Sequence, residues 1–158
     1  MIISTRPEAI HDEEFLQQLL LDVIAEELQA ESWPLQLRQS VLGVQCKIRR
    51  DGIRSVYPNG SSEIILADEV PVGWLVIDHS PDVIRLVEIM IVGASRGKGI
   101  GATLIRSVIA QGVQAGRPIR LNVHNTNLAA MRLYERLGFR SLGRDDVNTL
   151  MECLAPGE

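Results

Sequence analysis

Three glycines and two basic residues fall within six positions of this chain, in the stretch Arg96-Gly97-Lys98-Gly99-Ile100-Gly101. The unbroken apolar run at 89–92 before it predicts a strand that is covered on both faces. Apolar residues recur every four positions after it, which predicts a helix. The first turn of a helix leaves backbone N–H groups unpaired and carries the positive end of the helix dipole. Since glycines let an anion approach those groups and the basic side chains add charge, this stretch is predicted to bind a phosphate group.

Two common phosphate-binding motifs can be tested against this spacing. A P-loop needs four residues between its glycines and a Ser or Thr directly after its lysine. Here three residues separate Gly93 from Gly97, and Lys98 is followed by Gly99. The P-loop interpretation therefore fails.

A dinucleotide-binding fingerprint fits the glycine spacing better, because Gly97, Gly99 and Ala102 satisfy G-x-G-x-x-A after a strand. That fingerprint also needs an acidic residue about twenty positions later to hold the ribose. No Asp or Glu occurs between Thr103 and Tyr134, which argues against it. A tight turn, whose glycines serve backbone geometry only, is the remaining alternative to a phosphate site.

A second motif lies about thirty residues further on, after a predicted strand at 119–124. Its spacing is N-x-x-A-x-x-L-Y-x-x-x-G-F, and the matching residues are Asn127, Ala130, Leu133, Tyr134, Gly138 and Phe139. Together with the R/Q-x-x-G-x-G/A pattern of residues 96–101, it closely resembles the GNAT superfamily of acetyl-CoA-dependent N-acetyltransferases. The resemblance is clear from about residue 83 to the C-terminus and thinner upstream.

The resemblance implies a binding site for acetyl-CoA as co-substrate. In that family the glycine-rich loop holds the pyrophosphate through backbone N–H groups. The strand before the loop pairs with the pantetheine arm and offers an N–H to the thioester oxygen. The residues that this implies for cofactor binding are Met90, Ile91, Val92, Arg96, Gly97, Lys98, Gly99, Ile100, Gly101, Ala102 and Asn127.

Tyr134 is the residue that the resemblance assigns as general acid toward the coenzyme A sulfur. A phenol with a pKa near 10 is protonated at neutral pH and can donate a hydrogen bond to a developing thiolate. The alternative is a core-facing aromatic residue, because Met131, Leu133 and Leu137 lie on the same predicted helix. Asn127 would cap that helix or contact the cofactor arm, and the two roles are compatible.

A base is also needed, because an amine with a pKa near 10.4 is almost entirely protonated at neutral pH. Glu88 is the one carboxylate on the predicted central strand and matches a position that is often acidic in the family. It is the candidate base, acting directly or through water, or else it only orients the substrate ammonium. His79 and His124 are the alternatives.

The first half of the chain must position these residues from outside the two motifs. A short strand at 1–6 precedes a helix expected from a cap at Asp12 to about residue 29. After a break at 32–34, a second helix is expected at 35–50, with Gly52 at its end. The resembling family uses such a helical pair as one wall of the acceptor site. The second helix carries the polar residues Gln45, Lys47, Arg49 and Arg50, which its solvated face would also explain.

Strands at 63–67 and 72–78 follow, joined by a tight turn at Asp68-Glu69. A final antiparallel pair is expected at 140–142 and 148–154, linked through Asp145-Asp146. The predicted fold is a single α/β (α+β) GNAT-like domain over residues 1–158, with about four helices. Its mixed, mostly antiparallel central sheet should be splayed between the fourth and fifth strands.

Composition narrows the function further. The 158 residues are 46% hydrophobic, which suits one domain with a real core. A net charge of −4 and an aromatic content of 4% argue against a nucleic-acid binder. Cys46 and Cys153 lack the spacing of a metal site or a disulfide framework, and no signal peptide or membrane-spanning run is evident. We therefore expect a cytoplasmic protein without metal.

The expected activity is that of an acyltransferase that transfers groups other than amino-acyl groups. It would move an acetyl group from acetyl-CoA to a primary amine of a small molecule or protein, by direct attack in a ternary complex. The alternative is a non-catalytic acyl-CoA-binding sensor or interaction module. Neither the acceptor nor the oligomeric state follows from the sequence, and a homodimer is one option.

Overall fold

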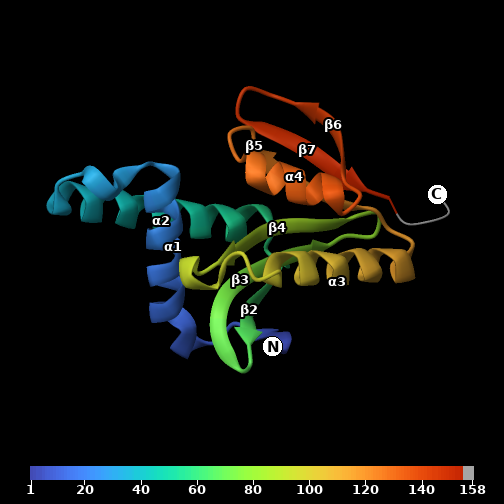
Figure 1. Ribbon diagram of the computed structural model, residues 1–158, viewed down its shortest axis with the longest axis horizontal. Helices are drawn as coiled ribbons and strands as arrows, with labels where there is room; N and C mark the ends of the chain where they lie inside the picture. The colour runs from blue at the N-terminus through green and yellow to red at the C-terminus, as the bar shows by residue number, and fades with distance from the viewer. Residues whose placement is uncertain (155–158) are drawn as a thin grey trace.

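A seven-stranded sheet runs through the molecule in the order β1-β2-β3-β4-β5-β7-β6 (Figure 1). The structure is a computed structural model that describes residues 1–154. The strands are β1 (Ile3–Pro7), β2 (Ser61–Ala67), β3 (Val70–His79), β4 (Ile84–Ile91), β5 (Ile119–His124), β6 (Arg140–Arg144) and β7 (Asn148–Cys153). All neighbouring pairs are antiparallel except β4 and β5. The predicted mixed, mostly antiparallel sheet is confirmed.

Four α-helices pack on the sheet, as predicted. They are α1 (Glu13–Glu27), α2 (Leu35–Val56), α3 (Ile100–Ala115) and α4 (Leu128–Arg136). In Figure 1, α3 and α4 lie in front of the sheet, and α1 and α2 cross each other at its left side. None of the helices within residues 1–154 is long and apolar enough to cross a membrane.

The helices close two hydrophobic cores, one on each face of the sheet. One core joins α3 and α4 to the sheet, and fully buried Ile105, Ile119 and Leu121 lie at its centre. The other joins α1 and α2 to the opposite face, around buried Leu20 and Trp74. The central strands are therefore covered from both sides, although Ile89 and Ile91 of β4 are only half-buried.

The sheet opens between β4 and β5, which confirms the predicted splay. Parallel pairing of these strands is confined to Ile84–Leu86 against Ile119–Leu121. Beyond that point β4 stays paired with β3 as far as Ile91, and β5 pairs with β7 as far as His124. The unpaired edges of the two central strands therefore face each other across a gap.

One prediction about the first half was wrong, and a second is confirmed only in position. Helix α2 does not end near residue 50 but continues to Val56, and Gly52 lies inside it with helical backbone angles. The helix ends where Pro58 disfavours a helical conformation of the preceding residue, Tyr57. Asp12 is the N-cap residue of α1, as predicted, but its side chain makes no capping hydrogen bond to that helix. Its carboxylate instead accepts hydrogen bonds from Arg6 at 2.8 Å and from the backbone N–H of Ala9 at 2.8 Å.

The β2–β3 hairpin follows the prediction. Its two-residue turn consists of Asp68 and Glu69, both with positive φ, which is the backbone geometry that matches the twist of a tight hairpin. The final hairpin also forms as predicted, and β7 inserts between β5 and β6. Asp145 closes it by accepting hydrogen bonds from the N–H groups of Val147 and Asn148.

Candidate active site

The glycine-rich loop leads directly into α3, as the sequence predicted. Gly97 and Gly99 have φ of 76° and 80°, a left-handed conformation that glycine adopts without strain. Gly101, in the first turn of α3, has an ordinary helical φ, and a Cβ added to it would meet no protein atom within 4 Å. Neither backbone geometry nor internal packing requires glycine at position 101. The space beside it is open to a ligand.

The first turn of α3 offers unpaired backbone donors to that space. The first N–H in this turn that bonds back to the loop is that of Thr103, which donates to the Gly99 carbonyl at 3.0 Å. The N–H groups of Ile100, Gly101 and Ala102 precede it and have no acceptor within the helix. With the positive end of the helix dipole, they fit the pyrophosphate of coenzyme A.

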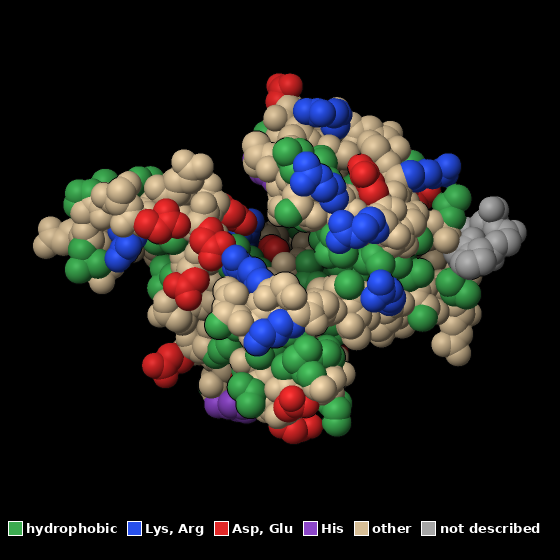
Figure 2. Space-filling view, in the orientation of Figure 1, with side chains coloured by type: hydrophobic (Ala, Val, Ile, Leu, Met, Phe, Trp, Pro, Cys, Tyr) green, Lys and Arg blue, Asp and Glu red, His purple; other side chains and the backbone are tan. Residues whose placement is uncertain are grey.

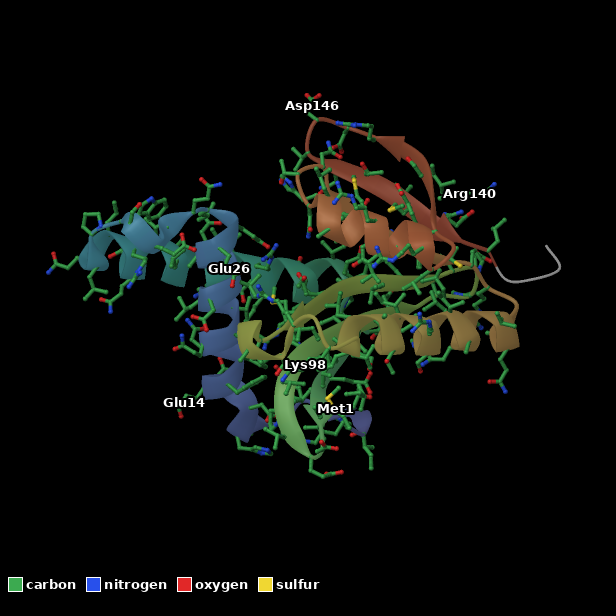
Figure 3. The ribbon with its side chains drawn as sticks, viewed as in Figure 1. Met1, Glu14, Glu26, Lys98, Arg140 and Asp146 are labelled. Carbon is green, nitrogen blue, oxygen red and sulfur yellow. The ribbon has the colours of Figure 1, made fainter. Side chains whose placement is uncertain are left out.

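The two basic side chains of the loop differ in their surroundings. Arg96 donates through Nε to the Ile91 carbonyl at 3.1 Å and through one terminal nitrogen to Glu26 at 2.6 Å. It therefore ties the loop to β4 and α1. Lys98 is exposed and has no ion pair within residues 1–154. Figure 3 labels Glu26 on α1 and Lys98 in the loop.

The backbone of β4 presents alternate groups to the gap. The Val92 N–H donates to the Val72 carbonyl at 2.8 Å, so it points toward β3. Because backbone directions alternate in an antiparallel ladder, Met90 points toward β3 as well, and Ile91 points into the gap. Of the predicted segment 90–92, Ile91 is thus the residue whose N–H is turned toward the open side.

Helix α4 supplies the other side of the gap. Asn127 caps it, accepting a hydrogen bond from the Ala130 N–H at 3.2 Å, as predicted. Tyr134 is 8% exposed, and its ring packs against Phe139 at a centroid separation of 5.6 Å. Its hydroxyl has no hydrogen-bond partner among the described residues. Burial, and to a smaller extent the charge of Glu88, raises the pKa of Tyr134 to about 12, so the phenol is protonated at neutral pH.

A β-bulge decides which way Glu88 faces. In the β3–β4 register, Ile77 lies opposite Leu86 and Val76 lies opposite Glu88, so Val87 is an extra residue. An inserted residue reverses the side-chain alternation that follows it. Glu88 therefore shares the α1–α2 face of the sheet with Val76, whereas an unshifted register would have turned it toward α3.

On that face, Glu88 meets a cation that is shared with another carboxylate. The Arg49 Nε lies 3.6 Å from a Glu88 oxygen, and its terminal nitrogens lie 3.2 Å and 3.3 Å from the Glu27 carboxylate. Desolvation raises the pKa of Glu88 to about 7, the negative charge of Glu27 adds to the rise, and Arg49 opposes it. A carboxylate with a pKa near neutrality suits a general base.

Glu88 and Tyr134 come from opposite faces of the sheet, yet the charge of Glu88 reaches the Tyr134 phenol. Glu88 lies on β4 just beyond Leu86, the last residue of β4 that pairs with β5. The two histidines proposed as alternative bases lie at strand ends. His79 ends β3, and the exposed His124 ends β5 with its Nδ1 2.7 Å from the Thr126 hydroxyl.

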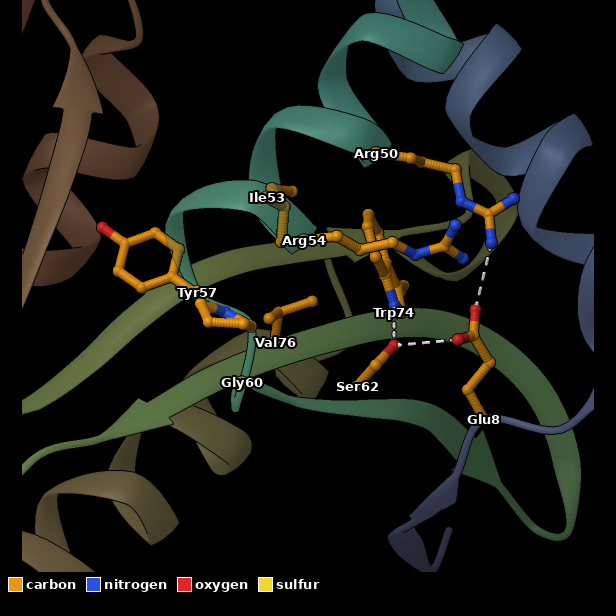
Figure 4. Close-up of a pocket in the computed structure, with 10 residues that line it drawn as sticks. Glu8, Arg50, Ile53, Arg54, Tyr57, Gly60, Ser62, Trp74 and Val76 are labelled. Atoms are coloured by element: carbon orange, nitrogen blue, oxygen red, sulfur yellow. Dashed lines mark hydrogen bonds and ion pairs between the residues drawn. The ribbon is translucent and has the colours of Figure 1, made fainter.

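A pocket of about 160 Å³ adjoins this site on the α1–α2 face (Figure 4). Trp74 donates to the Ser62 hydroxyl at 2.8 Å, and the buried Arg50 donates to Glu8 at 3.3 Å. Val76, which lies opposite Glu88 on the neighbouring strand, lines the pocket with Tyr57. The pocket therefore begins one strand away from the candidate base.

Basic and acidic side chains gather over different parts of the molecular surface. Figure 2 shows basic side chains over α3, α4 and the glycine-rich loop, and acidic side chains over α1. The sequence has the same division, with 15 acidic and 7 basic residues in 1–95 but 5 acidic and 9 basic residues in 96–158. The side of the gap that carries the glycine-rich loop is thus suited to phosphates, and the α1 side to a cation.

Sequence reasoning missed the part that Arg49 and Glu27 play. The sequence left Arg49 open between the wall of the acceptor site and the solvated face of its helix, and the structure pairs it with Glu88 of β4. One signal was available, since Arg49 follows the buried Cys46 by three positions and precedes the half-buried Ile53 by four. Glu27 offered no such signal, because its partner is 22 residues away.

A splayed mixed sheet with a glycine-rich helix start at the splay is the architecture that the resemblance to the GNAT acetyltransferases implied. The model of the acetyltransferase (GNAT) family matches residues 23–139, which is well over half of the chain. The chain belongs to this family, and the resemblance carried by the two sequence motifs is confirmed.

Solved structures share the whole fold at low sequence identity. The PaiA N-acetyltransferase of Thermoplasma acidophilum, in complex with coenzyme A, is 21% identical with a TM-score of 0.72, over 98% of this chain and 99% of its own. A GNAT family acetyltransferase from Elizabethkingia anophelis with acetyl-CoA bound is 14% identical with a TM-score of 0.62, over 96% and 97%. The ribosomal-protein-S18-alanine N-acetyltransferase of Escherichia coli is 15% identical with a TM-score of 0.65, over 99% and 97%.

Proposed function

We propose that this protein transfers an acetyl group from acetyl-CoA to a primary amine by direct attack in a ternary complex. The observation that carries the proposal is the opening between β4 and β5, with Glu88 on β4 and, on α4, the buried Tyr134, whose pKa the charge of Glu88 helps to raise. One has a pKa of about 7 and can accept a proton at neutral pH. The other has a pKa of about 12 and holds its proton. An acid and a base with pKa values so far apart have separable roles.

The residues of the loop and of β4 would hold the co-substrate. The N–H groups of Gly97, Lys98, Gly99, Ile100, Gly101 and Ala102 are the proposed pyrophosphate donors, with the Lys98 ammonium nearby. The Ile91 N–H is the proposed donor to the thioester oxygen, and Met90, Val92, Arg96 and Asn127 shape the channel for the pantetheine arm. Neighbours solved with coenzyme A or acetyl-CoA support this choice of ligand.

Acetyl-CoA supplies a thioester carbonyl and a thiolate leaving group when bound. Glu88 takes a proton from the acceptor ammonium, directly or through water, and the freed amine forms the new C–N bond. Tyr134 gives its proton to the sulfur as the C–S bond breaks, and it takes back, directly or through water, the second proton that the attacking nitrogen loses. The proton on Glu88 returns to solvent. Charge is conserved, and no further reactant is required.

The acceptor would approach from the α1–α2 face, because Glu88 points there. Val76 and Tyr57 then lie beside its path, and the pocket of Figure 4 has room for a small part of it. The acidic side chains of α1 favour a cationic amine in that approach. A small amine or a protein amine is compatible with this surface.

A non-catalytic acyl-CoA-binding module is the second candidate. The same open loop would serve it, but a sensor has no need of a carboxylate poised near neutral pH opposite a protonated phenol. Measuring free coenzyme A released from acetyl-CoA with a panel of primary amines separates the two. We expect amine-dependent release, and its absence for every amine class, with coenzyme A still bound, would favour the module.

Glu88→Gln sharpens this test because it keeps the size and hydrogen bonding of the side chain. The variant should lose most activity near pH 7 and recover part of it at high pH, where the free amine is abundant. An unchanged kcat with a raised KM would instead mean that Glu88 only binds the ammonium. Wild-type activity at every pH would exclude Glu88 and leave His79, His124 or water as the proton acceptor.

A further inference from the structure

The guanidinium of Arg49 bridges two carboxylates that come from two other elements. Its NH1 lies 3.2 Å from both Glu27 oxygens, and its NH2 lies 3.3 Å from one of them. The Nε edge of the same group faces Glu88 at 3.6 Å. Arg49 thus bonds to Glu27 in a forked geometry and reaches Glu88 only with its remaining edge.

The neighbouring arginine on α2 cannot replace it. Arg50 donates to Glu13 at 2.6 Å and to Glu8 at 3.3 Å, on the side of α2 that borders the pocket of Figure 4. In the part of the chain that the structure describes, Arg49 is the cation paired with Glu88. The side chains of Glu88 and Arg49 are 19% and 31% exposed, so the pair is partly shielded from solvent.

Three elements present groups to the Glu88 carboxylate. Helix α2 presents Arg49, helix α1 presents Glu27, and β4 presents the backbone N–H of Ile89. Tyr134 of helix α4 is close enough for the charge of Glu88 to raise its pKa, and its phenol is neutral at physiological pH. Arg49 favours the ionised form of Glu88 and Glu27 disfavours it, so the two charges of one ion pair act on Glu88 in opposite directions.

We propose that Arg49 is a positioning residue that orients the Glu88 carboxylate toward the opening and maintains its ionised form, while Glu27 limits how closely Arg49 pairs with it. Without Arg49, the buried carboxylate would take up a proton at neutral pH and could not accept one from the substrate. Without Glu27, the guanidinium would be free to form a full ion pair with Glu88 and weaken it as a base. The inference rests on the proposed role of Glu88.

Arg49→Met and Glu27→Gln test this idea because they remove the same ion pair from its two ends. Methionine keeps the apolar stem of the arginine and loses its charge. We expect Arg49→Met to move the acid limb of the kcat/KM profile to higher pH by about one unit. From a pKa of about 7, that shift leaves about a tenth of Glu88 ionised at pH 7 instead of half, a roughly fivefold loss that is recovered near pH 9.

Glu27→Gln should move the same limb to lower pH. A role confined to joining α1 and α2 predicts lower stability in both variants and no opposite displacement of the two profiles. Arg49→Lys keeps a cation near Glu88 and should fall between the wild type and Arg49→Met. Shifts in one direction for both variants, or no shift, would overturn the proposal.

The titration of Glu88 can also be followed without turnover. NMR of the protein with 13C-labelled glutamate carboxyls gives its pKa, and the resonance is assigned by its absence in Glu88→Gln. The opposite shifts of Arg49→Met and Glu27→Gln should appear there too. Glu26→Gln is the matched control, since it removes the adjacent charge of α1, which pairs with Arg96, and should leave the Glu88 titration in place.

This readout separates the two hypotheses. If Glu88→Gln retains wild-type kinetics while the opposite NMR shifts occur, the base assignment is wrong, and Arg49 still governs the charge of Glu88. If Glu88→Gln loses activity but neither variant moves the resonance, Glu88 remains the base and the role given to Arg49 is refuted.

Discussion

Gly101 offers a test in which stability and ligand binding change in opposite directions. It lies in the first turn of α3, has no positive φ, and faces open space. The Gly101→Leu variant should therefore fold without strain, and its free energy of unfolding should rise by up to about 0.8 kcal/mol because leucine has a higher helix propensity than glycine. For a chain of this size the gain corresponds to roughly 2–3 °C in Tm.

The same side chain should exclude the pyrophosphate, because it fills the space beside the N–H groups of the first helical turn. At a hundredfold excess over Kd, coenzyme A should stabilise the wild type by about 2.7 kcal/mol. That is roughly 5–10 °C in Tm for a protein of this length. Gly101→Leu should lose this increase. The variant should therefore melt at a higher temperature than the wild type without coenzyme A and at a lower temperature with it.

Gly52→Leu is the matched control for the thermal shift assay. Gly52 also lies inside a helix with nothing within 4 Å of an added Cβ, but on α2 and outside the loop. The Gly52→Leu variant should gain stability and keep the full increase in Tm with coenzyme A. Gly101→Ala, which the family pattern allows, should keep at least part of it. A full coenzyme A shift in Gly101→Leu would refute the pyrophosphate site, and a shift with NAD would favour a dinucleotide instead.

Three further substitutions test the acid, the base and the start of α1. Tyr134→Phe should keep the fold and coenzyme A binding, since it retains the ring packed on Phe139, and should lower kcat on the order of 100-fold; wild-type turnover would exclude Tyr134 as the acid. The raised pKa of Glu88 means that its neutral form stabilises the fold fully below about pH 4.5, and that this contribution is lost as pH rises to about 7. The free energy of unfolding of Glu88→Gln, measured with urea, should therefore rise relative to that of the wild type by up to about 3 kcal/mol as the pH increases between those values. A difference between the two proteins that does not change with pH would contradict the raised pKa. The hydrogen bond from Arg6 lowers the pKa of Asp12 from 3.8 to about 2. The ionised carboxylate therefore stabilises the fold above pH 4, and this stabilisation is lost as the pH falls to 2. Asp12→Asn should cost about 2 kcal/mol at pH 7 and little at pH 2, and equal losses at both would refute the ion-pair explanation.

The elements predicted correctly are those whose causes are local. Glycines before an apolar period of four residues predicted α3, and the two-residue turn at Asp68 and Glu69 predicted the β2–β3 hairpin. The end of α2 was wrong because Gly52 was given the meaning of a terminator. Glycine costs about 1 kcal/mol inside a helix, which the contacts of a 22-residue helix easily outweigh. Pro58 was the stronger signal.

The direction of Glu88 could not be predicted in this way. It depends on the single extra residue Val87 in the β3–β4 register, and alternation of apolar residues does not reveal such a bulge. The Glu27–Arg49 pair is likewise a product of how α1 and α2 pack, across 22 residues of sequence. Both concern the base and the acceptor side, where the sequence left the most alternatives open.

The proposed cofactor side of the site uses backbone groups, whereas the proposed acceptor side uses side chains. On the cofactor side, the donors are backbone N–H groups of the loop, α3 and Ile91, and their positions depend on the fold and on small residues rather than on particular side chains. Structures with 14–21% identity accordingly keep this architecture over nearly the whole chain. On the acceptor side, Arg49, Glu27 and the pocket beside Val76 act through side chains on α1, α2 and β3, which can change without disturbing the loop. The acceptor should therefore be sought in the chemistry of the α1–α2 face and not in likeness of fold, because the proposed donors to the co-substrate belong to the shared backbone, whereas the proposed contacts with the amine come from those side chains.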